Sequence, residues 1–281
     1  MITGATSGLG KVAALALAGT GARLYLVCRD AALADGLIAE IDAKTGNRHV
    51  AALIADLSSQ REVRRVGEEF LATRQPLHVM LNNAGAVFLR RELSVDGFER
   101  TFALNHLAYF TLTRALLDRL RESAPARVVN VASDAYTMAK GRFDFADVHA
   151  DRRYRFMRQY ARSKLANILF TRELARRLAG TSVTANAVTP PGLTATRFAH
   201  NTHPLAKVFL RLAAPFCVSP EDGARGLIFL CSSPAIDGVS GRFFVGTSET
   251  PLTPAATNDD DAHRLWDLSA EMTRGGGAPP S

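Results

Sequence analysis

The chain has 281 residues, of which 47% are hydrophobic and 22% are charged, a composition typical of globular proteins and unlike that of disordered, collagen-like or coiled-coil chains. Its formal net charge of +7 comes from basic residues scattered among acidic ones, so we expect no nucleic-acid partner. Cys28, Cys217 and Cys231 are too few and too far apart for a disulfide framework or a zinc site, which favours a reducing, cytoplasmic location and no metal. No apolar run approaches the roughly 18 residues that cross a bilayer, so we expect no membrane span.

In chain order, short apolar runs rich in β-branched residues alternate with longer segments of helical periodicity. The runs predict strands at residues 23–28, 49–54, 78–81, 127–131, 183–188 and 242–245. The periodic segments predict helices at residues 9–19, 31–44, 59–73, 97–122, 156–179 and 221–231. Strands that alternate with helices are joined by crossovers, and these strands are apolar on both faces. The sequence therefore predicts a single, doubly wound α/β domain with a mostly parallel central sheet of about seven strands.

The two ends of the chain differ from this pattern. We expect residues 1–250 to form the α/β domain and residues 251–281 to form a tail that carries one short helix near residues 263–272. At the other end, Met1 and Ile2 leave almost no first strand, although that strand is central in such a sheet. We hypothesise that the recorded start is late and that upstream apolar residues complete the strand.

A glycine-rich turn follows the place of the first strand. Gly4, Gly8 and Gly10 precede a predicted helix, and Ser7 and Leu9 complete the turn. Glycines let the backbone approach a pyrophosphate, and a helix N-terminus offers free N–H groups and a positive dipole end to the anion. Between a strand and a helix, this pattern favours the dinucleotide site of a Rossmann fold over a purely structural turn.

The end of the second predicted strand bears on which dinucleotide binds. A carboxylate there accepts hydrogen bonds from the ribose hydroxyls, whereas an arginine holds a 2′-phosphate. Cys28 cannot act as that acceptor and Arg29 offers a planar fork of donors, so the sequence favours NADP(H) over NAD(H). The alternative is that Arg29 is a surface residue paired with Asp30.

Four polar residues are candidates for catalysis. Tyr160 and Lys164 lie four residues apart in a predicted helix, which places the phenol and the ammonium on one face. Carbonyl reduction needs a proton donor, so we expect the ammonium to lower the phenol pKa from its usual value of about 10 toward neutrality. Ser133 ends a predicted strand at the edge where ligands bind, and its hydroxyl is placed to hold a substrate oxygen. Asn105 is an amide within an apolar helical stretch, and one hypothesis is a water relay to Lys164.

Together these motifs resemble the short-chain dehydrogenase/reductase family. The matching residues occur in the family's order as Thr3-Gly-x-x-x-Gly-x-Gly10, Asp56, Asn82-Asn-Ala-Gly85, Asn105, Ser133, Tyr160-x-x-x-Lys164 and Pro191-Gly-x-x-x-Thr196. The resemblance implies a catalytic tetrad of Asn105, Ser133, Tyr160 and Lys164. It also implies cofactor contacts at Gly4, Ser7, Gly8, Leu9, Gly10, Arg29, Asp56, Leu57, Asn82, Asn83, Ala84, Gly85, Tyr160, Lys164, Pro191, Gly192 and Thr196.

A narrower resemblance is to the retinol dehydrogenase branch of that family. It is carried by Cys28-Arg-Asp30, by Ser163 to Leu174, by His263 to Ser269 and by a long insert before Tyr160. Members of that branch prefer NADP(H) and act on retinoids or other lipophilic carbonyl compounds. Ser7 departs from the pattern, because many NADP-preferring relatives carry a basic residue there, and Ala132 replaces a frequent serine.

Two segments are expected to border the substrate. The insert at residues 137–159 carries several aromatic residues, and we favour a pocket wall over surface decoration. The segment at residues 193–218 includes an apolar stretch from Leu205 to Val218, for which a pocket lid is favoured over amphipathic contact with a membrane.

The sequence therefore predicts an NADP(H)-dependent oxidoreductase that interconverts a carbonyl and an alcohol on a small, lipophilic substrate, with Tyr160 as the general acid or base. The resemblance implies a homodimer or a homotetramer. The alternative is a non-catalytic NADP-binding sensor or interaction module, since a fold can persist after its chemistry is lost. The complete tetrad argues against that alternative.

Overall fold

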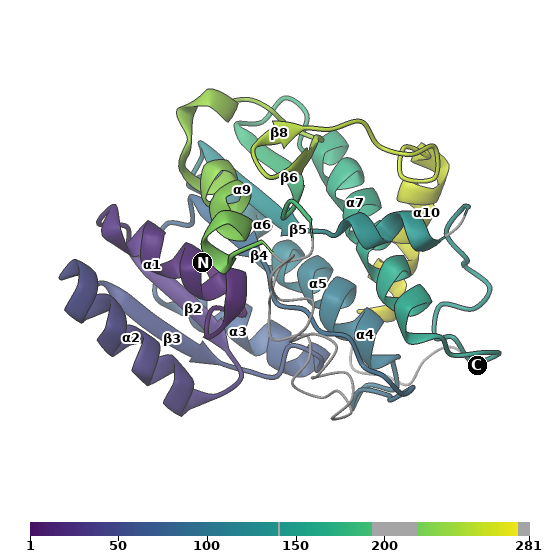
Figure 1. The fold of residues 1–281 in the computed structure, drawn as a ribbon, viewed down its shortest axis with the longest axis horizontal. Coiled ribbons are helices and arrows are strands. Elements are labelled where there is room, and N and C mark those ends of the chain that lie inside the picture. Colours follow the sequence, from purple (N-terminus) through teal and green to yellow (C-terminus); the bar gives the residue numbers. More distant parts are fainter. Residues whose placement is uncertain (140, 193–217, 275–281) are drawn as a thin grey trace.

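The computed structural model describes residues 1–139, 141–192 and 218–274. One sheet of eight strands, in the order β3-β2-β1-β4-β5-β6-β7-β8, runs through the centre of the molecule (Figure 1). The strands are β1 (Ile2–Thr3), β2 (Leu24–Cys28), β3 (Val50–Ile54), β4 (Val79–Asn82), β5 (Ala126–Val131), β6 (Val183–Thr189), β7 (Phe243–Val245) and β8 (Ser248–Glu249). All neighbours pair in parallel except β7 and β8.

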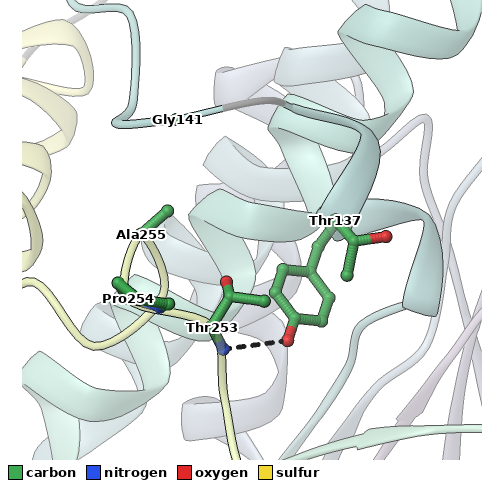
Figure 2. Close-up of a pocket in the computed structure, with 6 residues that line it drawn as sticks. Thr137, Gly141, Thr253, Pro254 and Ala255 are labelled. Carbon is green, nitrogen blue, oxygen red and sulfur yellow. Dashed lines mark hydrogen bonds between the residues drawn. The ribbon is translucent and has the colours of Figure 1, made fainter.

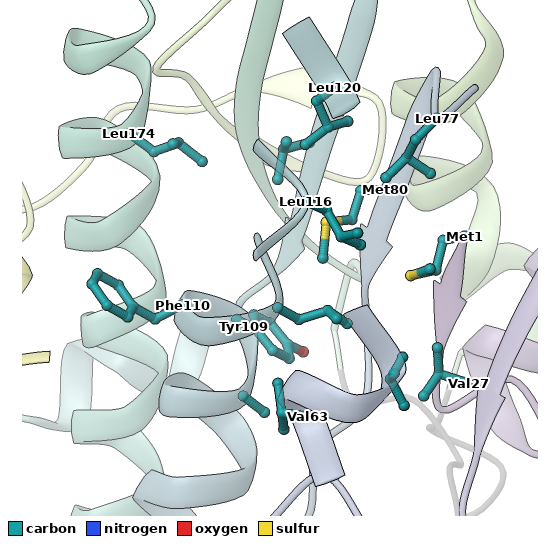
Figure 3. Packing of buried hydrophobic residues seen from close by; sticks show 14 of the residues in the cluster. Met1, Val27, Val63, Leu77, Met80, Tyr109, Phe110, Leu116, Leu120 and Leu174 are labelled. Carbon is teal, nitrogen blue, oxygen red and sulfur yellow. The ribbon is translucent and has the colours of Figure 1, made fainter. Parts of the chain in front are cut away.

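Helices cover both faces of the sheet. They are α1 (Gly8–Gly19), α2 (Ala31–Thr45), α3 (Gln60–Ala72), α4 (Arg100–Phe102), α5 (Ala108–Ala115), α6 (Leu117–Glu122), α7 (Phe156–Arg177), α9 (Pro220–Ser232) and α10 (Asp259–Met272), with short turns η1 (Ala103–Leu107), η2 (Asp134–Ala139) and η5 (Pro234–Ile236). Apolar side chains of α1, α2 and α9 form one core cluster with the sheet, and those of α3, α5 and α7 form another, part of which Figure 3 shows. The predicted doubly wound α/β fold is confirmed.

The predicted helix over residues 97–122 is broken into four pieces. Between α4 and α5, residues 103–107 form a π-helical turn, and α6 follows after a further break at Leu116. A single π-helical turn adds one residue to an otherwise helical stretch, and an apolar stretch does not reveal a shift of one position, so the sequence pattern did not separate the pieces. The π-helical turn carries Asn105, which places this candidate residue on an irregular part of the helix.

The end of the domain and the tail are both attached to the rest of the fold. In the domain, Ser248 and Glu249 pair antiparallel with β7 and extend the sheet. In the tail, the structure has a helix where one is expected near residues 263–272, and it begins earlier than expected. Helix α10 begins at Asp259, because the Asn258 side chain accepts a hydrogen bond from Asp261 N and three aspartates occupy the first turn. Its Trp266 packs with Phe110 and Phe170, which anchors the tail to α5 and α7.

Within the part of the chain that the structure describes, no helix has the length and apolarity required to cross a bilayer. The predicted lid at residues 193–218 lies, except for Val218, outside the described residues, as do Cys217 and Thr196. The first strand occupies the predicted central position between β2 and β4.

A close backbone contact joins α9 to the turn after β7. A Cβ atom on Gly226 would lie 2.4 Å from the carbonyl oxygen of Gly246, closer than side-chain atoms pack in folded proteins. Gly226 is buried, and only a glycine lets the helix approach this turn. Gly36, on the exposed face of α2, has no atom within 4 Å of the equivalent position.

Replacing Gly226 with alanine is expected to lower the free energy of unfolding by roughly 1–3 kcal/mol, since the new methyl group overlaps the Gly246 backbone. The matched control, Gly36→Ala, should raise it by roughly 1 kcal/mol, because alanine is the better helix former and has space. Urea denaturation measures both. Equal effects of the two substitutions would show that the contact does not constrain the fold.

Candidate active site

The glycine turn is held in a shape that only glycine allows. Gly4 and Gly8 have φ angles of 66° and 53°, in the left-handed region. A Cβ atom on Gly10 would lie 2.4 Å from both Gly4 O and Asn83 Nδ2. The Asn83 side chain donates hydrogen bonds to Thr3 O at 2.9 Å and Gly4 O at 3.1 Å, and so fixes the turn from the neighbouring strand end.

This turn fits a pyrophosphate. Helix α1 begins at Gly8, and its N-cap residue Ser7 makes no side-chain hydrogen bond to the helix. The first turn contains no acidic residue, so the positive end of the helix dipole is not offset there. Backbone N–H groups without side-chain caps at a glycine-lined helix start are the features that bind phosphate groups.

The segment after β4 connects the turn to the candidate catalytic residues. Thr3 Oγ1 accepts hydrogen bonds from the backbone N–H groups of Asn83 and Ala84. A Cβ atom on Gly4 would lie 2.8 Å from Ala84 Cα, and one on Gly85 would lie 3.2 Å from Asn105 Oδ1 and 3.5 Å from Lys164 Nζ. Two consecutive small residues therefore separate the glycine turn from Lys164.

Asn82, the first residue of this motif, has a different role from its neighbours. Its side chain is fully buried and donates to Thr113 Oγ1 at 3.0 Å and to Asn130 Oδ1 at 2.8 Å. The amide joins β4 to α5 and β5 inside the core. The side-chain N–H groups of Asn82 are therefore engaged inside the core and do not make the cofactor contact that the resemblance implies.

Arg29 is exposed at the carboxyl end of β2. Asp30 caps α2, because its carboxylate accepts a hydrogen bond from Leu33 N at 3.0 Å. Among the ion pairs of the described residues, none joins Arg29 to Asp30, so Arg29 is a surface residue, as the alternative has it, but is not paired with Asp30. Beyond β3, Asp56 is exposed and accepts hydrogen bonds from the backbone and hydroxyl of Ser58, and Leu57 is buried.

Tyr160 and Lys164 lie one turn apart on α7, as the spacing predicts. The Lys164 Nζ atom is 5.7 Å from the centre of the Tyr160 ring and donates to Val131 O of β5 at 3.0 Å. Ser133 lies two residues after the end of β5, and its hydroxyl is hydrogen-bonded to the Tyr160 hydroxyl. The structure therefore brings these three candidates together, one from the segment after β5 and two from α7.

Asn105 lies beside this group and is held by its amide. Its Oδ1 accepts from Ala86 N at 2.9 Å, while its Nδ2 donates to Ala86 O and to Ser163 Oγ, both at 3.0 Å. These contacts fix the segment that follows Gly85 against α7. No hydrogen bond in the described part of the chain joins Asn105 to Lys164 directly, and the water relay stays a prediction.

Burial shifts both titrating groups of the pair. It raises the pKa of Tyr160 to about 12, and the hydrogen bond from Ser133 opposes this only in part. It lowers the pKa of Lys164 to about 7. In the chain by itself the phenol pKa is therefore raised, because burial is the largest effect on it, and the shift toward neutrality stays a prediction for the protein with a nicotinamide bound.

A cavity of about 240 Å³ lies next to the turn η2 that follows Ser133 (Figure 2). It is lined by Tyr136, Thr137, Gly141, Thr253, Pro254 and Ala255. The Tyr136 hydroxyl accepts a hydrogen bond from Thr253 N at 3.3 Å, which ties η2 to the tail.

The insert at residues 137–159 contributes to this cavity only at its start. Phe143, further along, is buried, with its ring 6.2 Å from that of Phe102 and 4.8 Å from that of Phe145. These rings are packed against the domain, whereas much of the insert, including residues 151–153 and 155–158, is exposed. Its role as a wall of the substrate pocket stays a prediction.

At the other side of the site, Pro191 and Gly192 follow β6, and Gly192 has a φ angle of 67°. Thr196, the last residue of that motif, is outside the described ranges. Within those ranges, no group of three or more His, Cys, Asp or Glu side chains is arranged to hold a metal ion.

Sequence reasoning missed three buried residues of the site. Ser163 bonds Asn105, and Asn167 Nδ2 donates to Val131 O at 3.3 Å, the same carbonyl that accepts from Lys164. Both lie on the face of α7 defined by Tyr160 and Lys164, so helical spacing alone would have found them. Tyr109, on α5, has its ring centre 5.9 Å from Lys164 Nζ, and no sequence signal marked it.

A buried histidine links this site to the tail. His106, next to Asn105, lies 3.4 Å from Asn167 Oδ1 through Nδ1 and 2.9 Å from Ser269 Oγ of α10 through Nε2. Burial lowers its pKa to about 4, opposed by the hydrogen bond with Asn167. The ring is therefore neutral at physiological pH.

Known proteins are similar to this chain over most of its length. A family model described as short chain dehydrogenase matches residues 1–205. Retinol dehydrogenase 12 of Bos taurus is 41% identical over 272 residues, which cover 97% of this chain and 85% of that protein. A solved structure of an uncharacterized protein from Mycobacterium paratuberculosis is 32% identical, with a TM-score of 0.74 over 99% of this chain and 94% of that one. The NADP complex of RhlG from Pseudomonas aeruginosa is 28% identical, with a TM-score of 0.68 over 87% of this chain and 92% of that one.

The pKa of His106 predicts a loss of stability in mild acid. The unfolded chain takes up a proton near pH 6.5, whereas the folded chain does so only near pH 4, so stability falls as the pH drops between these values. Across this window the free energy of unfolding should fall by at most about 3 kcal/mol. Urea unfolding at a series of pH values should show a smaller slope in this window for His106→Gln. An unchanged slope would mean that the imidazole is not held neutral.

Proposed function

The chain belongs to the short chain dehydrogenase family and is retinol dehydrogenase-like, and from this we propose that it is an NADP(H)-dependent oxidoreductase that interconverts a carbonyl and an alcohol on a lipophilic substrate. One observation carries the proposal. Lys164, Tyr160 and Ser133 lie together, and only Ala84 and Gly85 separate Lys164 from the glycine turn. A dinucleotide whose pyrophosphate rests on that turn would extend along these two residues to the three side chains.

The proposed chemistry divides between the cofactor and the chain. A bound nicotinamide would supply or accept the hydride. Tyr160, with its pKa raised to about 12, holds its proton at neutral pH and can donate it to a carbonyl oxygen. Ser133, hydrogen-bonded to that phenol, is placed to hold the same oxygen. Lys164 charges near neutral pH, and in its charged form it favours loss of the phenol proton, as oxidation of an alcohol requires.

Two observations support NADP(H) over NAD(H). Arg29 is exposed at the end of β2 and has no ion pair with Asp30, whose carboxylate caps α2. Its guanidinium is therefore available for a 2′-phosphate. The structurally similar RhlG was solved with NADP.

The class of substrate is proposed from the relatives. Retinol dehydrogenase 12 of Bos taurus carries a retinoid alcohol in its name and aligns with 97% of this chain. We propose that the substrate here is likewise a lipophilic alcohol or aldehyde. The insert and the segment at residues 193–218 are proposed to border it.

Tyr160→Phe is expected to reduce the turnover of NADPH with a lipophilic aldehyde at least a hundredfold, because the variant lacks the proton donor. Binding of NADPH, followed by its fluorescence, should change little. The reaction is first established in the wild type with a panel of aldehydes, ketones and alcohols. Tight NADPH binding without turnover across the panel would favour a non-catalytic sensor, and undiminished turnover in the variant would refute the role of Tyr160.

Arg29→Ala is expected to weaken NADPH binding about tenfold to a hundredfold, the loss of charge-assisted hydrogen bonds to one phosphate, and to leave NADH binding nearly unchanged. Arg23→Ala is the matched control, because Arg23 is also exposed but precedes β2 and so lies at the opposite end of that strand. Fluorescence titration with each nucleotide gives both affinities. Equal weakening of NADPH and NADH in Arg29→Ala would argue against contact with the 2′-phosphate.

A further inference from the structure

Two aromatic rings lie close to the Lys164 ammonium. The ring of Tyr160 on α7 has its centre 5.7 Å from Nζ, and the ring of Tyr109 on α5 has its centre 5.9 Å from the same atom. Both distances are within the range of cation–π attraction. Tyr109 is 1% exposed and lies one helical turn beyond Asn105, on the side of α5 that packs against the sheet and α3.

The Lys164 amine has few other partners. Its side chain is buried, and its hydrogen-bond acceptor is the neutral carbonyl of Val131. No ion pair of the described residues includes Lys164, and burial is the cause of its lowered pKa. The titratable groups facing it are the two phenols, while β5 and the segment after β4 contribute the Val131 carbonyl and Gly85. The charged form therefore depends on weak, neutral partners.

The hydroxyl of Tyr109 does not explain why a tyrosine is found here. That oxygen is buried without a hydrogen-bond partner among the described residues. Burial raises the pKa of Tyr109 well above its ordinary value, so it stays neutral and does not compete with Tyr160 as a proton donor. The ring, with its negative face near the ammonium, is the part of the side chain that can act on Lys164.

We propose that Tyr109 is a positioning residue whose ring stabilises the charged amine of Lys164 beside Tyr160. The consequence for catalysis rests on the proposed function, because it requires that Lys164 acts on the phenol. The electrostatic contact itself does not depend on turnover. It can be measured in the protein without substrate.

The test follows the titration of Lys164 directly. The chain has five lysines, so a protein labelled with 13C at lysine Cε gives few signals, and Lys164→Arg identifies the one of interest. In Tyr109→Leu the titration midpoint of Lys164 should fall by about half to one pH unit, the shift expected when a cation–π partner is lost. Tyr109→Phe keeps the ring and should leave the midpoint unchanged. Tyr109→Met, which fills more of the space, replaces Tyr109→Leu if the latter does not fold.

Phe110→Leu is the matched control. It removes a fully buried ring from the next position of α5, where the ring packs against Phe170 and Trp266. It should lower the melting temperature without moving the Lys164 midpoint. The proposal would be overturned by an unchanged midpoint in Tyr109→Leu, or in Tyr109→Met where that variant replaces it, and equally by a midpoint that moves as far in Tyr109→Phe or Phe110→Leu.

The pH profile of kcat/KM gives a second reading. In Tyr109→Leu, the limb that reports Lys164 should move in the same direction and by the same amount as the NMR midpoint. If the NMR midpoint shifts and no variant or wild type turns over any substrate, the contact stands and the proposed function fails. If turnover is present but the midpoint does not move, the proposed function stands and the role of Tyr109 is refuted.

Discussion

The burial of one amine at the carboxyl end of β5 organises the site. Lys164 reaches from α7 to the carbonyl of Val131, and Asn167, one turn further along, donates to the same oxygen. These two bonds set the rotation of α7 against the sheet. That rotation brings Tyr160 beside Ser133, and it places the amine 3.5 Å from the position that a Cβ atom on Gly85 would take. A polar atom in a core must find a partner, so this contact constrains the helix more strongly than apolar packing alone, which tolerates repacking.

Other buried polar side chains are joined by a series of hydrogen bonds that runs through the core. Asn82 bonds to Asn130, Asn130 to Thr171, and Thr171 to the Asn167 carbonyl, while His106 connects Asn167 to Ser269. Each of these residues is buried. Among the described residues Asn82 Oδ1 has no hydrogen-bond partner, but the hydrogen bonds named above favour one arrangement of the elements that they join, since a shift leaves further buried groups unpaired. The strand ends that carry the site are therefore held by hydrogen bonds to β4, β5, α7 and α10 together.

Much of this architecture follows from local patterns in the sequence. Apolar runs located six strands, and the four-residue spacing located Tyr160 and Lys164, because both signals depend on neighbours along the chain. The protonation states did not follow, since they depend on how deeply Tyr160 and Lys164 are buried by distant segments. The role of Asp30 was ambiguous in the sequence for a similar reason. Its carboxylate caps α2 through a hydrogen bond from Leu33 N, which depends on the backbone geometry at the start of that helix. The π-helical turn at Asn105 and the pairing of β8 depend on hydrogen bonds that composition does not encode.

The π-helical turn also makes the helical residues before it and after it face different parts of the fold. A turn with i→i+5 bonds holds one residue more than an α-helix, so the residues before it are rotated by about 100° relative to those after it. Before the turn, Glu99 accepts from Gln159 and Thr101 lies 3.3 Å from the Tyr154 hydroxyl, both in the region of the insert. After it, Tyr109 and Thr113 face the sheet. Loss of that single extra residue would rotate Glu99 and Thr101 away from Gln159 and Tyr154 while Tyr109 and Thr113 kept their contacts with the sheet.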